Sequence, residues 1–310
     1  MKLYAPSYYP AFRCIAGECR HSCCIGWEIC IDPATLARYK ALSPKARKAI
    51  LTPTVTDQSG TSFRLTKEGR CPHLDGDGLC RLIIDHGEDL LCDICREHPR
   101  FYNCFSDRTE VGLGLCCEEA ARLILTETAP FSLLTIEEDD EAGIPDPFET
   151  LFFAHRQENF QILFDRSLPP DERIGRLARR YSLSTHRLFG EDHRWQALYR
   201  SLERLDPQWD AALSAWEASP ALSSPLPQWE SAAEQLIAYF LYRHLSDAID
   251  GGDYPQRVAF ALLSTYVICR IAHARCPDDL PTLIDTARAY SAEVEYSEDN
   301  LRTVLDALAE

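Results

Sequence analysis

Apolar residues recur at helical spacing throughout the second half of the chain. Leu236, Phe240, Leu241 and Leu245 show the pattern, because they fall on one face of a helix. Proline residues and the Gly-Gly pair at 251–252 separate successive apolar segments. No strand pattern of comparable clarity occurs here, so this half is predicted to be an all-α bundle. Its helices are expected over residues 148–165, 171–181, 192–205, 207–218, 228–249, 255–274, 281–291 and 298–309.

Shorter patterns occupy the first part of the chain. Asp32-Pro33 has the residue types of a helix start, with Asp as N-cap and Pro at the first helical position, and this helix is expected to reach about Leu42. The capping role accounts for Asp32 without a catalytic one. A second helix is predicted over residues 44–51. Apolar–polar alternation and a Gly-Asp-Gly turn signal predict short strands over residues 25–31, 62–66 and 79–84, the last two forming a β-hairpin.

An acidic segment separates the two patterns. Glu137 to Glu141 form an unbroken acidic run, and Pro130 and Pro145 lie on either side of it. We interpret this segment as a connection between domains. The sequence therefore predicts a mainly α protein with three parts: a cysteine-rich metal-binding domain with a short β-hairpin over residues 1–130, an acidic linker over 131–147, and a helical domain over 148–310.

Twelve of the fourteen cysteines lie between Cys14 and Cys117. So many thiols in one segment need a common chemistry, and metal ligation and disulfide bonding are the two candidates. Cys92 and Cys95 are about one helical turn apart, a spacing typical of zinc and iron–sulfur ligands. Cys116 and Cys117 precede strong helix formers, so the positive end of a helix dipole would stabilise a thiolate there.

The chain lacks the usual signals for export. No apolar run approaches the roughly 20 residues that cross a bilayer, and prolines and tyrosines interrupt the N-terminal segment. We therefore predict a cytoplasmic protein without membrane association. Thiols stay reduced in that compartment, which favours metal over disulfides. One zinc ion or one cubane cluster uses four cysteines, so the segment has enough thiols for two centres, and its composition does not separate zinc from iron.

The net charge of −16 is unevenly placed. Residues 1–130 carry 16 basic and 17 acidic side chains, whereas residues 131–310 carry 16 and 31. This excess of acid argues against binding to nucleic acid, which requires clustered basic residues. It is compatible with attraction of a basic protein partner and also with an ordinary solvated surface.

Several other residues have ordinary structural explanations. The tryptophans of the second half are expected to pack in its core, and Cys269 and Cys276 are expected to be buried as small apolar residues. Arg96, Arg100 and Arg108 lie near the cysteines in sequence, where they either offset thiolate charge or belong to the surface. The chain has neither the Cys-x3-Cys-x2-Cys signature of radical S-adenosylmethionine enzymes nor the Gly-x-Gly-x-x-Gly turn of a Rossmann fold.

The cysteine motifs together carry a family resemblance. Cys14-x4-Cys19-x3-Cys23-Cys24 is followed by Gly26-Trp27, and Leu91-Cys92-x2-Cys95-Arg96 by Pro99-Arg100. With Cys71-Pro72, Gly78-x-Cys80 and Cys117-x-Glu119-Ala120-Ala121-Arg122, the pattern resembles the flagellin lysine-N-methylase family, FliB. The first part also resembles the YkgJ-type cysteine-cluster proteins, which are proposed zinc or iron chelators. The matching motifs span residues 14–125.

This resemblance implies an enzyme that transfers methyl groups from S-adenosylmethionine to lysine side chains of a protein substrate, flagellin, and that binds a [4Fe-4S] cluster. It implies metal ligation by Cys14, Cys19, Cys23, Cys24, Cys71, Cys80, Cys92, Cys95 and Cys117. Two features depart from the family pattern. Cys116-Cys117-Glu118-Glu119 stands where the family has Ser-Cys-Pro-Glu, and Cys30 is additional. A non-catalytic zinc- or iron-binding module that senses redox state or binds flagellar subunits is the alternative hypothesis.

Overall fold

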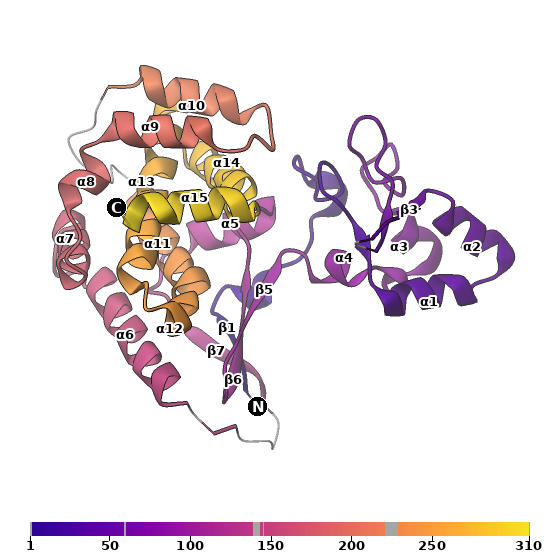
Figure 1. The fold of residues 1–310 in the computed structure, drawn as a ribbon, viewed down its shortest axis with the longest axis horizontal. Coiled ribbons are helices and arrows are strands. Elements are labelled where there is room, and N and C mark those ends of the chain that lie inside the picture. Colours follow the sequence, from indigo (N-terminus) through magenta and orange to yellow (C-terminus); the bar gives the residue numbers. More distant parts are fainter. Residues whose placement is uncertain (1, 59, 139–142, 145, 221–228, 310) are drawn as a thin grey trace. The chain divides into compact units, whose positions relative to one another are not determined.

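The computed structural model describes residues 2–58, 60–138, 143–144, 146–220 and 229–309. It divides into two compact units (Figure 1). The cysteine-rich unit comprises Arg13–Arg100, and the helical unit comprises Met1–Phe12 together with Phe101–Glu310. This boundary differs from the predicted one, because residues on both sides of the cysteine motifs belong to the helical unit.

Short elements make up the cysteine-rich unit. Its three-stranded antiparallel sheet has the order β2-β4-β3. Both predicted helices are confirmed, and the side chains of Asp32 and Ser43 accept N-capping hydrogen bonds at their starts. The elements are β2 (Cys30–Ile31), α1 (Pro33–Ala41), α2 (Pro44–Leu51), β3 (Thr54–Thr56), β4 (Thr61–Phe63), α3 (Arg81–His86) and α4 (Asp93–Glu97).

The predicted hairpin around the Gly-Asp-Gly turn is wrong. Residues 81–86 form helix α3, in which Leu82 is buried and an Arg81–Asp85 ion pair of 2.6 Å joins successive turns. An isolated bridge between Leu74 and Cys80 and a hydrogen bond of 2.9 Å from the Asp75 N–H to the Leu79 carbonyl close the turn without forming two strands. The actual hairpin is β3–β4, and the strand predicted over residues 25–31 shrinks to β2. As a helix, this segment buries Leu82 and leaves Ile83 and Ile84 exposed, so its apolar residues do not alternate as a half-buried strand requires.

A four-stranded sheet, absent from the prediction, lies in the helical unit. Its order is β5-β6-β1-β7, with β1 (Lys2–Pro6), β5 (Arg100–Cys104), β6 (Arg108–Leu113) and β7 (Leu133–Glu138). Strand β1 runs parallel to β6 and antiparallel to β7, so Leu3 lies between Thr109 and Glu137. The first part of the predicted linker is thus a strand, whereas residues 139–142 and 145 lie outside the described residues.

The predicted helices of the second half are confirmed with shifted ends, except that the one predicted over 228–249 ends at His244 and the separate helix α12 follows it, while residue 228 lies outside the described residues. Helix α13 is buried along most of its length and packs against α10, α11, α14 and α15 (Figure 1). All four tryptophans of this half are buried, as predicted. The helices are α5 (Glu118–Thr126), α6 (Pro147–Leu163), α7 (Pro170–Arg180), α8 (Thr185–Phe189), α9 (Asp192–Ser201), α10 (Trp209–Ala218), α11 (Glu230–His244), α12 (Ala248–Gly251), α13 (Tyr254–Arg275), α14 (Leu280–Tyr290) and α15 (Glu298–Ala309).

Among the described residues, α13 is the one helix that is long and apolar enough to cross a membrane. Of its most apolar window, 83% is buried inside the protein, as expected for a core helix. Cys269 lies within this helix and is buried, as predicted, whereas Cys276 at its end is exposed, contrary to the prediction.

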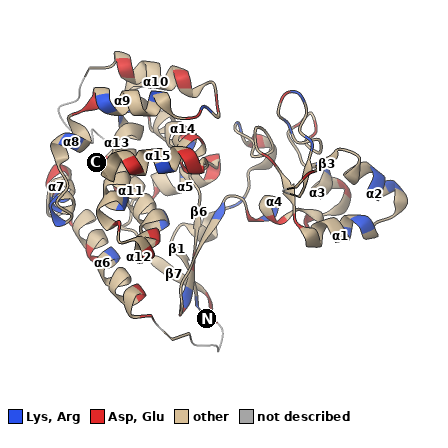
Figure 2. Cartoon of the chain, in the orientation of Figure 1, with Lys and Arg blue, Asp and Glu red and all other residues tan. Residues whose placement is uncertain are grey.

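Basic side chains are distributed differently in the two units (Figure 2). In the cysteine-rich unit they gather on α1 and α2, which carry Lys40, Lys45 and Lys48. The helical unit contains a single lysine, Lys2, and its remaining cationic side chains are arginine and histidine.

Candidate functional site

The cysteine-rich unit contains eight of the nine cysteines that the family resemblance selects. The ninth, Cys117, lies in the helical unit as the N-cap residue of α5. All fourteen cysteines are described, and none forms a disulfide. The eight are Cys14, Cys19, Cys23, Cys24, Cys71, Cys80, Cys92 and Cys95.

Backbone hydrogen bonds join the first cysteine loop to the second. The Cys71 N–H donates to the Cys24 carbonyl over 2.7 Å, and the Gly26 N–H donates to the Gly69 carbonyl over 2.8 Å. Both glycines have positive φ, which other residues rarely adopt. The chain turns sharply at both points, and Cys24 and Cys71 are consequently fixed side by side although they are far apart in sequence.

The second pair of thiols stands at the start of α4. The Cys92 carbonyl accepts the N–H of Cys95 over 3.0 Å, so the two residues lie within one turn, as their spacing predicted. Asp32 holds this turn in place: its carboxylate accepts the Asp93 N–H over 3.0 Å as well as the Thr35 N–H over 2.8 Å. One carboxylate thus caps both α1 and α4.

Five thiols share one neighbourhood, and we call them the five-thiol cluster: Cys24, Cys71, Cys80, Cys92 and Cys95. Burial raises the pKa of Cys71, to about 11, and of Cys80, and the charges of Cys24 and Cys92 act on both in the same direction. A hydrogen bond from Cys23 lowers the pKa of Cys24 to about 7, with Arg70 adding to the effect. A hydrogen bond from Cys95 similarly lowers the pKa of Cys92. In each pair the hydrogen bond therefore favours the thiolate form of the accepting thiol.

The surroundings of these thiols favour a soft metal. Cys71 and Cys92 are buried in the small apolar core beside Tyr39 and Phe63. The hydroxyl of Tyr39 lies 3.5 Å from the Cys92 sulfur and donates to the Leu90 carbonyl over 2.6 Å. Thiolates are the preferred ligands of zinc ions and iron–sulfur clusters, so these five cysteines have the chemistry of such a site. The part of the chain that the structure describes nevertheless brings no three His, Cys, Asp or Glu side chains close enough to hold a metal ion.

The other selected thiols lie at the edge of this arrangement. Cys14 and Cys23 are exposed. The hydrogen bond with Cys24 and burial raise the pKa of Cys23, and the charges of Cys14 and Cys95 add to this effect. Cys30, which is not among the cysteines that match the family motifs, is exposed on β2. Arg96, considered above, pairs with Asp93 over 2.9 Å, and Arg70 is the arginine whose charge helps to lower the pKa of Cys24.

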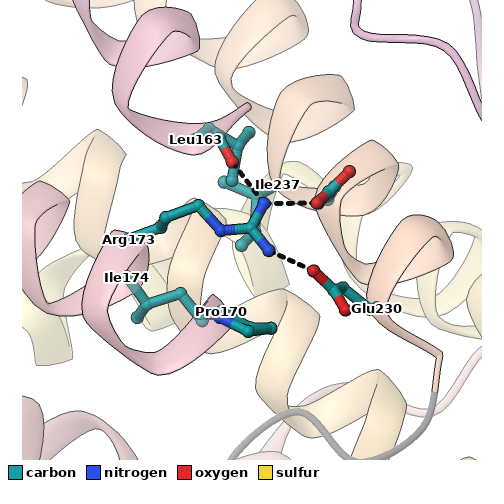
Figure 3. A pocket seen from close by; sticks show the side chains of 7 residues that line it. Leu163, Pro170, Arg173, Ile174, Glu230 and Ile237 are labelled. Carbon is teal, nitrogen blue, oxygen red and sulfur yellow. Dashed lines mark hydrogen bonds and ion pairs between the residues drawn. The ribbon is translucent and has the colours of Figure 1, made fainter. Parts of the chain in front are cut away.

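Among the hollows along the described residues of the helical unit, two differ greatly in volume. The smaller one, of about 10 Å³, is bordered by α6, α7 and α11, where Arg173 contacts the Leu163 carbonyl and the carboxylates of Glu230 and Glu234 (Figure 3). It has room for about one water molecule, so Arg173 serves to join α7 to α11. The larger one, of about 540 Å³, is an open depression along α7 and α8 beside Tyr266.

A buried polar cluster in the helical unit was missed from the sequence. Helix α11 supplies Tyr239, Arg243 and His244, and all three contact the carboxylate of Glu295. The side chain of Glu295 is fully buried and ends a π-helical segment, Ser291–Glu295. Such segments occur frequently at functional sites. No sequence motif joins these positions, because the contact between residues 239–244 and 295 forms only in the folded chain.

Comparison with known proteins gives distant relatives. The chain is similar to proteins named lysine-N-methylase from Salmonella choleraesuis (strain SC-B67) and Salmonella typhimurium (strain LT2), each 27% identical over 169 residues. It is also similar to a flagellar biosynthetic protein FliU of Salmonella muenchen, 27% identical over 134 residues. No protein-family profile and no solved structure matches the chain.

These matches are partial. Each lysine-N-methylase match covers 53% of this chain and 41% of the relative, so the aligned part spans less than half of those enzymes. The FliU match covers 41% of this chain and 79% of the relative. The expected resemblance to FliB-like proteins is thus supported at the level of sequence similarity, and the similarity says nothing about a metal cluster.

Proposed function

We propose that this chain is a metal-containing lysine N-methyltransferase that acts on a protein. Its similarity to two proteins named lysine-N-methylase carries the proposal. S-adenosylmethionine is the proposed methyl donor and flagellin the proposed substrate, since a flagellar protein is also among the relatives. The location is proposed to be the cytoplasm, where the thiols stay reduced.

The proposed metal ligands come from the five-thiol cluster. Four thiolates satisfy one [4Fe-4S] cluster or one zinc ion, and iron–sulfur is our first choice because the resemblance to the flagellin lysine-N-methylase family implies a [4Fe-4S] cluster. When bound, such a group would tie the two cysteine loops to α4 and supply either structural stability or an open iron. The protein side of the reaction requires a deprotonated lysine: its nitrogen bonds to the sulfonium methyl carbon, the carbon–sulfur bond breaks, and the amine proton passes to a base.

The test uses protein purified without oxygen, flagellin, and S-adenosylmethionine that carries a labelled methyl group. We expect about four irons and four sulfides per chain, and labelled methyllysine in flagellin detected by mass spectrometry. Flagellin whose lysines have been chemically acetylated is the matched negative substrate. Cys92→Ser should remove both metal and activity, whereas Cys30→Ser, at an exposed thiol, should retain them.

The remaining outcomes also discriminate. Stoichiometric metal without methyl transfer to any lysine-containing protein would overturn the enzymatic proposal. It would leave the non-catalytic metal-binding module, which the thiol content equally supports.

A further inference from the structure

The buried polar cluster around Glu295 already holds a cation. The guanidinium of Arg243 lies between two aromatic rings, 4.9 Å from the centroid of Phe101 and 4.9 Å from that of Tyr296. Its Nη1 donates to the Tyr239 hydroxyl over 2.7 Å, and its Nε is 3.4 Å from Glu295 Oε1. Two aromatic walls and one carboxylate are the elements that recognise an alkylammonium group.

The fold fixes the side chains around Arg243 in place; we call them the seat of its guanidinium. The Tyr239 hydroxyl accepts the Leu115 N–H over 3.2 Å and donates to Glu295 over 3.0 Å. His244 Nε2 contacts the same carboxylate over 2.7 Å. The ring of Phe101 lies against Gly112, where a Cβ atom would come within 2.2 Å of it. A glycine in β6 thus allows one wall of the seat to take its position.

The seat has a floor in the core and a mouth at the surface. The side chain of Glu295 is 0% exposed, whereas that of Arg243 is 13% exposed. Phe101 and Tyr296 are also partly exposed. The cation therefore lies at the outer, partly exposed end of the cluster, which is the end nearest to solvent.

The rest of the helical unit offers no competing ammonium group. Its single lysine, Lys2, pairs with Glu138 over 2.9 Å in the β1–β7 ladder. The charged pairs in its interior use arginine instead, as in Arg156–Glu110 and Arg173–Glu234. A lysine-binding site in this unit would therefore bind a lysine of another molecule, because the unit's own lysine is already paired with Glu138.

We propose that Phe101, Tyr239, Glu295 and Tyr296 form the binding seat for the ammonium group of a substrate lysine, and that Arg243 closes this seat in the free protein. The identity of the ligand as lysine rests on the proposed function. An incoming ammonium group replaces the guanidinium between the rings and takes over its contacts with Tyr239 and Glu295. Arg243 is then displaced through the mouth into solvent, where its charge is hydrated.

The experiment measures binding of Nα-acetyl-L-lysine methylamide to the full chain by calorimetry, without a methyl donor. Nα-acetyl-L-norleucine methylamide, which lacks the charge, is the matched probe. Arg243→Gln removes the occupant and should bind the lysine probe on the order of tenfold more tightly than the wild type, since binding no longer competes with closure. Adding Glu295→Gln should abolish that gain. Arg257→Gln, at a comparably exposed arginine that pairs with Asp247 and Asp253, should bind like the wild type.

Equal binding of the two probes, or lysine binding that does not depend on Glu295, would overturn the inference. If Arg243→Gln does not fold, Arg243→Lys decides, because it places an ammonium group in the seat. A melting temperature near that of the wild type supports an ammonium seat, and a collapse of stability shows that only a guanidinium fits.

The outcome is separable from that of the methyltransferase test. Lysine-selective binding without methyl transfer would support the ammonium seat and overturn the proposed enzymatic activity. Methyl transfer that persists unchanged in both Tyr296→Leu and Glu295→Gln would do the reverse.

Discussion

The two units of this protein are stabilised by different means. The helical unit has a large continuous core in which α11 and α13 are buried on nearly all sides. The core of the cysteine-rich unit is small, and two of its buried members, Cys71 and Cys92, are themselves candidate ligands. Because a small core seldom suffices for stability, we expect the fold of the cysteine-rich unit to depend on a metal bound by its thiols.

The two units also differ in how their interior polar groups are satisfied. In the helical unit, buried charges already face complementary charges, as in Arg156–Glu110 at 2.6 Å. In the cysteine-rich unit the buried thiols face one another, so the like charges of their ionised forms repel. A metal ion would reverse that repulsion. The helical unit therefore pairs opposite charges in its interior, whereas the cysteine-rich unit places groups of like charge together.

The sharpest test of this difference is Cys92→Ser. We expect it to abolish metal binding and to unfold the cysteine-rich unit, with a loss of stability on the order of 5 kcal/mol or more, because structural metal sites supply most of the folding free energy of small domains. Metal analysis and limited proteolysis of the full chain measure the effect. The helical signal in circular dichroism should largely survive.

Cys30→Ser is the matched control for that experiment, since Cys30 lies in the same unit and is exposed. The Cys30→Ser variant should lose less than about 0.5 kcal/mol of its free energy of unfolding. Equal damage from both substitutions would contradict a special role for the five-thiol cluster.

In the helical unit the largest effect is expected from Arg156→Met. It leaves the carboxylate of Glu110, which is 0% exposed, without its partner. Removal of one partner of a buried ion pair costs about 3–5 kcal/mol. Urea denaturation measures the loss, and the double variant Arg156→Met/Glu110→Leu should recover most of it. Arg176→Met, which breaks an exposed pair with Glu172, should cost about 0.5 kcal/mol. A double variant no more stable than the single one would show that the pair is net stabilising.

How much the sequence could predict follows the same division. The helices of the second half were predictable because their apolar periodicity is local and Asp or Pro marks several starts, as at Asp146 and Pro170. The sheet was not, because β1 pairs with segments more than a hundred residues away: Leu3 with Thr109 and with Glu137. Strand partners this far apart in the chain leave no periodic pattern in the sequence from which their pairing could be predicted.

The candidate sites show the same limit. The count and spacing of cysteines pointed to the thiol-rich region directly. The choice of five central thiols depended on contacts such as Cys71 N–H with the Cys24 carbonyl, which no spacing predicts. The seat around Glu295 was not predictable at all, since Phe101, Tyr239 and Glu295 come from three distant segments.

A pH titration separates the two kinds of polar interior. Burial disfavours the ionised form of Glu295, but the Arg243 charge and the His244 hydrogen bond outweigh it and hold the pKa at about 2. A depressed carboxyl pKa adds stability above the unfolded value of 4.5, and this stability is lost as the pH falls toward 2. Burial lowers the pKa of His244, so acid below its ordinary value of 6.5 also destabilises the fold.

We therefore expect the helical unit to lose about 3 kcal/mol from Glu295 alone between pH 5 and pH 2. Thermal unfolding of the full chain at a series of pH values measures this slope. Glu295→Gln should be less stable at pH 7 and should show a shallower slope below pH 5. An unchanged slope in Glu295→Gln would assign the acid sensitivity to other carboxylates.

The smallest expected effect concerns Asp32, whose carboxylate caps α1 and also holds the first N–H of α4 beside Cys92. Asp32→Ala removes both hydrogen bonds and should cost about 1–2 kcal/mol, whereas Ser43→Ala, which removes the single cap of α2, should cost about 1 kcal/mol. Denaturation of the metal-loaded protein measures both. Asp32→Ala should also weaken metal retention against a chelator, because the Cys92–Cys95 turn loses its anchor, and Ser43→Ala should not. Equal retention in the two variants would mean that the metal itself holds the thiols of α4. The stability of the cysteine-rich unit would then depend more on the metal than on the hydrogen bonds of Asp32.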